Sequence, residues 1–135
     1  MSGLDDIQVK VESPGFCHNA LPILHEIRHA LAKLVESGEN TVIDLNAIPF
    51  GPGDEDELLA VLGKGEVSAT VDALGPTLVS ETGYAGVWLV DYRDADDNRI
   101  AFQIEVTETP EILKAHPDDM WDGAERLAAG LQGVS

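Results

Sequence analysis

The sequence predicts an α+β fold in which about three helices flank one antiparallel β-sheet of about four to five strands. Helical periodicity dominates residues 19–62, a period of two dominates residues 66–107, and helical spacing returns after Pro117. The 135 residues suffice for one hydrophobic core, and no internal repeat or low-complexity linker divides them. We therefore expect an N-terminal strand or arm over residues 1–18 and a single domain over residues 19–135.

The chain begins with a short alternating segment and continues into its most regular helix. Apolar and polar residues alternate over residues 7–11, which fits a strand or an extended arm. Asn19 is then a suitable N-cap, Pro22 is tolerated in a first helical turn, and Ser37-Gly38 predicts the helix end. The apolar stripe between them consists of Leu24, Ile27, Leu31 and Leu34.

A strand and a second helix come next. Residues 41–45 are rich in β-branched side chains and precede a Pro/Gly break at residues 49–53. Residues 54–57 are all acidic and form a first helical turn, where negative charge is favourable at the positive end of the helix dipole. Gly63 ends this helix. Its buried side is expected to consist of Leu58, Leu59, Val61 and Leu62.

Residues 66–107 predict an antiparallel meander. Residues 66–73 alternate, with Val and Ala on one side and polar residues on the other, as in a strand half covered by core. Gly75-Pro76 turns the chain into a strand over residues 77–82, and residues 86–92 pair with residues 100–106 through a turn at 94–98.

Two helical segments complete the chain. Ile112 and Leu113 follow Pro110 and indicate a short helical turn. Pro117 then opens a final helix, because proline is favoured in the first turn and two acidic residues follow it. The buried face of this helix is expected to use Met120, Trp121, Leu127 and Leu131.

The charge balance excludes several classes of partner. Twenty-five acidic residues against eight Lys and Arg give a formal charge of −17, so phosphate backbones and anionic membranes would be repelled. A cationic protein partner fits better. The lone Cys17 forms neither an internal disulfide nor a thiol cluster. No signal peptide or membrane-spanning run is visible, so we expect no membrane insertion and a cytoplasmic location.

His25, Glu26 and His29 match the H-E-x-x-H pattern of zinc hydrolases. In that pattern two imidazoles one helical turn apart bind the metal and the glutamate acts as base. Here the apolar stripe lies opposite both histidines, so they should face water, and no third ligand is identifiable. A solvated helix face is the favoured interpretation, adventitious Zn²⁺ or Ni²⁺ binding by His25 and His29 comes second, and a zinc-dependent hydrolase remains an alternative.

Two further patterns have structural explanations. Asp94, Asp96, Asn98 and Glu105 take the spacing of an EF-hand calcium loop, but Arg99 occupies the position that needs glycine. A polar hairpin turn followed by an inward or paired Glu105 is favoured. Trp88 shares one face of its strand with Tyr92; core packing is the favoured role of Trp88, and a binding platform is the alternative.

Several segments in order resemble one known family. The first are residues 19–27 (NALPILHEI), with Ala30-Leu31 and Leu34, and residues 43–45 (IDL). Five later ones are residues 65–69 (GEVSA), 81–82 (ET), 86–88 (GVW), 104–106 (IEV) and 110–113 (PEIL). Their order and spacing are similar to those of the C-terminal domain of the HupH/HyaF hydrogenase expression family, over about residues 19–130. The longer members of that family carry an additional N-terminal half.

This resemblance implies a non-catalytic accessory protein or chaperone for maturation of [NiFe] uptake hydrogenase, without a cofactor. The implied partners are the iron–sulfur small-subunit precursor, before its assembly and export, and other maturation proteins. A precursor with a twin-arginine export signal presents a basic, partly apolar segment, which a charge of −17 would attract.

Specific retention of such a segment also requires an apolar patch or an open strand edge. The candidate partner-binding residues lie on the predicted sheet and are Glu66, Ser68, Glu81, Thr82, Trp88 and Glu105. A third class of function, an acidic nucleic-acid mimic that binds basic proteins, would require a continuous ridge of carboxylates.

Overall fold

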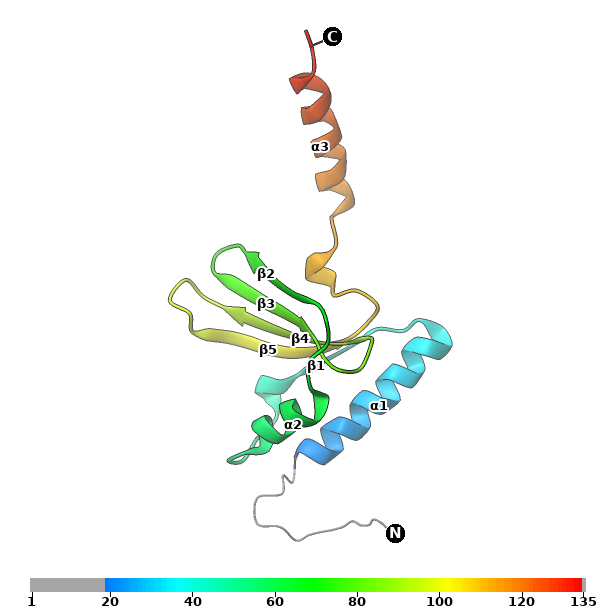
Figure 1. The fold of residues 1–135 in the computed structure, drawn as a ribbon, viewed down its shortest axis with the longest axis vertical. Coiled ribbons are helices and arrows are strands. Elements are labelled where there is room, and N and C mark those ends of the chain that lie inside the picture. The colour runs from blue at the N-terminus through cyan, green and yellow to red at the C-terminus, as the bar shows by residue number, and fades with distance from the viewer. Residues whose placement is uncertain (1–18, 135) are drawn as a thin grey trace.

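Residues 19–134 are described by a computed structural model, in which a five-stranded sheet carries two helices on one face while a third helix projects from the other side (Figure 1). The predicted strand or arm over residues 1–18 lies outside the described residues. Among the helices of the described part, none combines the length and the apolar composition that a bilayer crossing requires.

The strands are antiparallel throughout, as predicted. They are β1 (Thr41–Asp44), β2 (Ser68–Asp72), β3 (Pro76–Glu81), β4 (Val87–Arg93) and β5 (Arg99–Val106). Consecutive strands β2 to β5 form the predicted meander, and β1 pairs with β5, so the order is β1-β5-β4-β3-β2. β4 therefore lies at the centre of the sheet, and β1 and β2 form its edges.

Helices α1 (Ala20–Ser37) and α2 (Asp54–Leu62) cover one face of the sheet, which we call the helix-covered face. Both were predicted, and Gly38 ends α1 in a left-handed conformation (φ 76°). The prediction was wrong for Val61, which is 47% exposed at the edge of a groove. The core on this face consists of Ala20, Ile23, Ile27, Ala30, Ile43, Leu45, Leu58, Leu62, Val87, Phe102, Ile104 and Val106.

Asn19 precedes α1 as predicted, but its side chain does not cap the helix. Its Nδ2 donates instead to the carbonyl oxygen of Pro49 (2.8 Å) and to Asp54 Oδ2 (3.3 Å). Asp54 is buried, and the same oxygen accepts a hydrogen bond from the backbone N–H of Gly51 (2.6 Å). The two residues therefore join the beginning of α1 to the beginning of α2.

The first strand is one residue shorter than predicted. Asp44 Oδ1 accepts from the N–H of Asn46 (2.9 Å), which starts the 3₁₀ turn η1 (Leu45–Ala47) directly after β1. Leu45 is buried in the core as part of this turn. A local side-chain hydrogen bond thus ends the strand before the apolar sequence pattern does.

A short 3₁₀ turn, η2 (Glu111–Leu113), covers part of the opposite face of the sheet, which we call the outer face. Its Ile112 and Leu113 pack against a second cluster formed by Val79, Trp88 and Val90. This turn was predicted from the same two residues. Both faces of β4 are therefore buried, one by helices and the other by a single turn.

The final helix, α3 (Pro117–Gly130), begins where predicted, but the prediction of its buried face was wrong. Within the described part of the chain no residue of α3 is buried. Residues 114–116 carry the chain away from the sheet, so α3 has no neighbouring element to cover it in Figure 1. The exposed residues include Met120, Trp121, Leu127 and Leu131.

A charged cluster joins the β4–β5 hairpin to α2. The Asp91 side chain, which is 13% exposed, forms ion pairs with Arg93 (2.9 Å) and Arg99 (3.4 Å). Arg99 also pairs with Glu55 of α2 (3.3 Å), and its guanidinium lies 4.0 Å from the centre of the Phe102 ring. Asp91 thus anchors the arginine that connects the sheet to α2.

We expect Asp91→Ala to lower the free energy of unfolding by about 1–3 kcal/mol, because it removes the least exposed carboxylate from two partly buried guanidinium groups and leaves them only Asp97 and Glu55. Asp97→Ala is the matched control: Asp97 also pairs with Arg93, but its side chain is 74% exposed. Its cost should stay below about 0.5 kcal/mol. Urea unfolding measures both, and equal costs would contradict the anchoring role of Asp91.

Candidate partner-binding surface

Three of the six predicted partner-binding residues form a row across the outer face. Glu81 of β3 is opposite Trp88 of β4, and Trp88 is opposite Glu105 of β5. Side chains of directly opposed residues share one face of an antiparallel sheet. The sheet register therefore places one carboxylate, that of Glu81 or Glu105, on each side of the Trp88 indole.

Trp88 lies beneath η2 and is 7% exposed. Its Nε1–H donates to the carbonyl oxygen of Thr107 (3.1 Å), so the polar atom of the ring is satisfied inside the protein. Tyr92 lies on the same face and packs at the margin of this cluster. Trp88 therefore packs in the core, which is the role that the sequence analysis favoured.

Glu105 is also buried, although it is acidic. Its Oε1 accepts a hydrogen bond from the backbone N–H of Glu111 (3.4 Å), the first residue of η2. Burial raises the pKa of the Tyr92 hydroxyl above its ordinary value of 10.0, and the Glu105 carboxylate raises this pKa further. Glu105 thus helps to hold η2 on the sheet.

Glu81, Glu66 and Thr82 lie where β3 ends beside the segment that leads into β2. Glu81 Oε1 accepts from the N–H of Glu66 (3.2 Å). Thr82 is buried: its Oγ1 accepts from the N–H of Tyr84 (3.1 Å) and donates to the carbonyl oxygen of Tyr84 (3.2 Å). A Cβ atom at Gly65 would collide with the Thr82 carbonyl and the Glu81 carboxylate, so only glycine allows this close approach.

Ser68 lies on the other face of the sheet, because β2 alternates as predicted. With Thr70 and Asp72 it is exposed on the part of the helix-covered face that α1 and α2 do not reach. The structure therefore does not bring Ser68 together with Trp88 and Glu105. Of the six residues, Glu66, Ser68 and Glu81 offer accessible side chains, whereas Thr82, Trp88 and Glu105 are buried.

β2 is an open edge of the sheet: among residues 19–134 no strand pairs with its outer side. The carbonyl oxygen of Val67 accepts from Glu81 N–H (2.9 Å), and Ala73 N–H donates to Gly75 (3.2 Å), both across the β2–β3 hairpin. Hydrogen-bonded and non-bonded pairs alternate along antiparallel strands, so the backbone groups of Ser68, Thr70 and Asp72 point outward. They form a short row of donors and acceptors available to an added strand.

His25 and His29 are exposed on α1, as the helical spacing predicted. The guanidinium of Arg28 lies 3.3 Å from His29 Nε2. Within the described part of the chain, no three His, Cys, Asp or Glu side chains come together as a metal site. Among residues 19–134 the motif therefore has two ligand-type side chains on one helix face and no third one from another element.

The calcium-like spacing belongs to the β4–β5 hairpin turn. Asp94 Oδ1 accepts from the N–H groups of Asn98 and Asp96, each at 2.9 Å. These hydrogen bonds, that from Asn98 first, hold the pKa of Asp94 below its ordinary value of 3.8. Glu105 lies further along β5, on the outer face. The Asp94 carboxylate thus organises its own loop, as the polar-turn interpretation stated.

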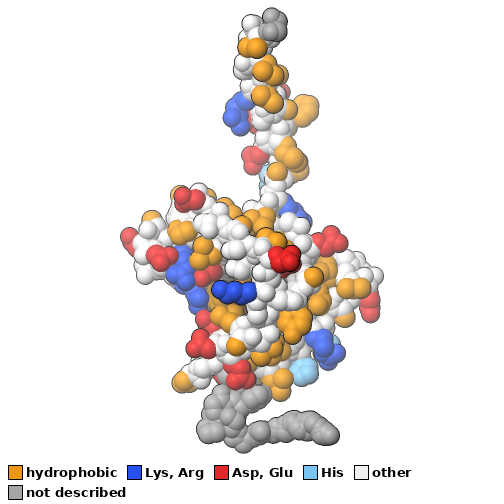
Figure 2. All heavy atoms as spheres, viewed as in Figure 1, with side chains coloured by type: hydrophobic (Ala, Val, Ile, Leu, Met, Phe, Trp, Pro, Cys, Tyr) orange, Lys and Arg blue, Asp and Glu red, His pale blue; other side chains and the backbone are white. Residues whose placement is uncertain are grey.

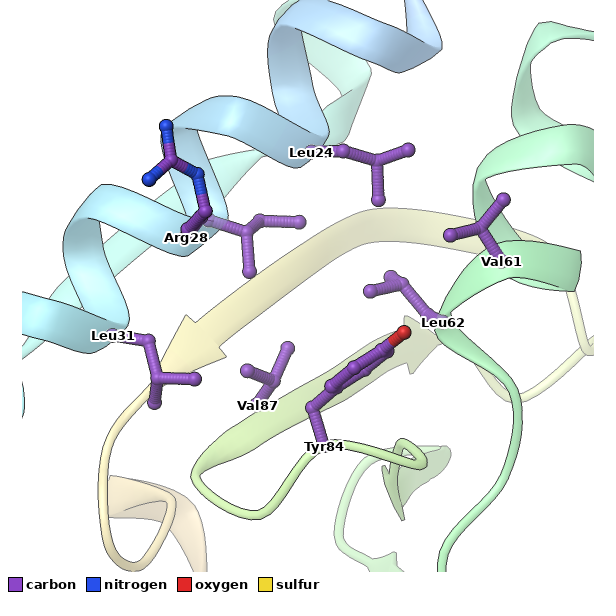
Figure 3. A pocket seen from close by; sticks show the side chains of 8 residues that line it. Leu24, Arg28, Leu31, Val61, Leu62, Tyr84 and Val87 are labelled. Atoms are coloured by element: carbon purple, nitrogen blue, oxygen red, sulfur yellow. The ribbon is translucent and has the colours of Figure 1, made fainter. Parts of the chain in front are cut away.

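A groove between α1 and α2 was missed by sequence reasoning. It has a volume of about 260 Å³ and almost entirely apolar walls. Figure 3 shows leucine side chains of α1, Val61 and Leu62 of α2, and Tyr84 around one hollow, with Arg28 at its rim. The exposed Val61 and Tyr84 come from separate segments, so no single stretch of sequence signals the groove. The complete lining is Leu24, Ile27, Arg28, Leu31, Val61, Leu62, Tyr84 and Val87.

Carboxylates are scattered over the face of the molecule seen in Figure 2, among apolar and uncharged side chains. They do not form a continuous ridge on that face. The acidic nucleic-acid mimic therefore gains no support from this view.

We expect the raised pKa of Tyr92 to be measurable by ultraviolet absorbance titration of Tyr84→Phe, which leaves Tyr92 as the chain's one tyrosine. The pKa should exceed 10.0, and Glu105→Gln should lower it only in part, because burial is the larger cause. Since the folded pKa is the higher one, stability from the neutral phenol is complete below the unfolded pKa and is lost as pH rises through the folded pKa. An unshifted pKa would contradict the burial of Tyr92 beside Glu105.

Comparison with known proteins identifies the family. The family model described as "HupH hydrogenase expression protein, C-terminal conserved region" matches residues 17–134. The solved structure of hydrogenase expression protein HupH from Thiobacillus denitrificans is 39% identical, with a TM-score of 0.82, and the match covers 87% of this chain and 98% of that one.

Two relatives extend this similarity. Hydrogenase expression/formation protein HoxQ of Azotobacter vinelandii is 33% identical, over 86% of this chain and 42% of the relative. Hydrogenase expression/formation protein HupH of Rhizobium leguminosarum bv. viciae is 31% identical, over 85% of this chain and 41% of the relative. This chain thus spans about two-fifths of each, and it belongs to the HupH hydrogenase expression protein family, where it corresponds to the C-terminal conserved region.

Proposed function

We propose that this protein is a non-catalytic accessory protein or chaperone in the maturation of [NiFe] uptake hydrogenase, acting in the cytoplasm. Membership of the HupH family carries the proposal, because its relatives are named as hydrogenase expression/formation proteins. The proposed partner is the iron–sulfur small-subunit precursor before export, in concert with other maturation proteins.

The open edge of β2 is the proposed point of attachment. An extended segment of the precursor would add to the sheet as a sixth strand beside β2, through the outward backbone groups of Ser68, Thr70 and Asp72. Main-chain pairing of this kind tolerates variation in the bound sequence. It suits a protein that must hold an incompletely assembled chain.

Charge near this edge favours a basic segment. Asp72 is exposed on β2, Glu66 is exposed just before it, and Glu81 is half-buried on the neighbouring strand. A twin-arginine segment lying along β2 would therefore pass three carboxylates. In the proposed complex Glu66, Ser68 and Glu81 make the contacts, while Thr82, Trp88 and Glu105 hold the strands and η2 beneath them.

The described residues give little support to the zinc-hydrolase alternative. His25, Glu26 and His29 lie on an exposed helix face, and no third ligand approaches them within residues 19–134. A catalytic zinc site needs three protein ligands and an open fourth position. Alanine at His25 and His29 should accordingly leave precursor binding unchanged.

Isothermal calorimetry with the small-subunit precursor tests the proposal. Thr70→Pro removes one outward N–H from the edge without removing a β2–β3 hydrogen bond. We expect it to weaken binding at least about tenfold, since several edge hydrogen bonds depend on that register. Thr70→Val is the matched control, because it keeps the N–H and the branched shape, and it should bind as the unchanged protein does.

Raising the salt concentration should lower the association rate, because opposite charges steer the encounter. The absence of binding at low salt would overturn the proposed partner. Equal binding by the Thr70→Pro and Thr70→Val variants would overturn the β2 edge as the point of attachment. Stoichiometric zinc in protein purified without an affinity tag, lost in His25→Ala, would revive the hydrolase alternative.

A further inference from the structure

Helix α3 presents an apolar stripe that no element of the described chain covers. At about 100° per residue, Met120, Leu127 and Leu131 fall within about 40° of one another, and Trp121 widens the stripe to about 120°. Trp121 is 72% exposed. Figure 2 shows apolar side chains along this projecting helix. Clustered apolar side chains of this size mark an interaction surface.

The opposite side of α3 is acidic. It carries Asp118, Asp119, Asp122 and Glu125, against the single Arg126, which already pairs with Asp122 (2.8 Å). Asp118 and Glu125 lie one helical turn from Trp121 and flank the apolar stripe, so two α3 helices packed through their stripes would bring these like charges together. The surface that accepts α3 should therefore be apolar at its centre and cationic at its rim.

The groove between α1 and α2 has both properties. Its walls are apolar, and its volume of about 260 Å³ is below the roughly 300–1,000 Å³ of sites for small-molecule ligands. It suits a large side chain inserted from a helix better than a cofactor. The exposed Tyr84 and Val61 at its mouth leave it open to the outside.

The rim supplies the complementary charge. Arg28 lines the groove. Within residues 19–134 Arg28 and Lys64 are the Lys and Arg side chains that form no ion pair with a carboxylate. In a chain of charge −17, an arginine without an ion pair on the wall of an apolar groove favours an acidic, apolar occupant.

We propose that each copy of this chain inserts its α3 into the α1–α2 groove of a second copy, with Trp121 as the anchor. Trp121 enters between the leucines of α1 and Tyr84, where Arg28 can lie against the indole face. Asp118 and Glu125, which lie one helical turn from Trp121 on the surface of α3, then face Arg28 at the rim of the groove. Reciprocal insertion fills both grooves and closes a two-fold dimer.

The groove of a second copy is a better host than the chain's own groove. Leu113 packs on the outer face of the sheet, whereas the groove lies on the helix-covered face. The three residues between Leu113 and Pro117 span at most about 13 Å, even when fully extended. Figure 1 shows α3 directed away from α1 and α2, on the other side of the sheet. This proposal uses neither β2 nor the precursor, so it stands apart from the proposed function.

Light scattering and sedimentation of the full chain should give the mass of two chains. Trp121→Ala should raise the dimer dissociation constant at least about tenfold, as expected for a central aromatic anchor. Ala129→Ser, on the opposite side of α3, is the matched control and should leave that constant unchanged. Because both positions are exposed, neither variant threatens the fold.

A second variant tests the groove itself. Val61→Asp places a negative charge at the exposed edge of the groove and should also favour the monomer. An equal mixture of the Trp121→Ala and Val61→Asp variants keeps one intact helix and one intact groove. It should therefore form two-chain species more readily than either variant alone.

A monomeric unchanged chain at tens of micromolar would overturn the proposal, whether α3 then remained free or folded back on its own groove. A dimer that survives Trp121→Ala, or open assemblies larger than two chains, would overturn it as well. Precursor binding by the Trp121→Ala variant separates the two proposals: its retention alongside loss of the dimer confirms that the surfaces are distinct.

Discussion

Burial of the central strand β4 on both faces is the constraint on which the rest of the structure depends. Val87 and Leu89 face α1 and α2, while Trp88 and Val90 face η2. Because side chains alternate along a strand, a register slip of one residue would exchange these two sets and place each against the wrong cover. The meander, the placement of β1 beside β5 and the position of η2 all satisfy this one requirement.

The two faces of the sheet are covered to different extents, and the parts left uncovered include the edge proposed for binding. Two helices cover β1, β5 and part of β4, whereas one 3₁₀ turn, hydrogen-bonded to the Glu105 carboxylate, covers the outer face. Neither cover reaches the polar side of β2. The proposed attachment of an extended segment uses this open edge, which is short and flanked by carboxylates, and these limit pairing with acidic chains.

Charge gives the molecule a second asymmetry. Most Lys and Arg side chains of the described part are committed to nearby carboxylates, such as Arg99 to Asp91 and Glu55. Arg28 and Lys64 remain, and Arg28 lines the apolar groove, while α3 carries acidic residues beside an uncovered apolar stripe. Self-association through groove and helix would leave the β2 edge accessible in each copy. A paired accessory protein could then present two such edges.

Local periodicity and turn residues predicted both early helices, the meander and the 94–98 turn. The order of short sequence segments indicated the family. The sequence also placed His25 and His29 on the exposed side of α1, opposite the leucine stripe. Periodicity states which side chains share a face, but not what covers that face. Only the tertiary structure therefore decided that η2 buries Trp88, that α3 leaves Trp121 uncovered, and that segments far apart in the chain enclose a groove, because each of these depends on contacts between distant residues.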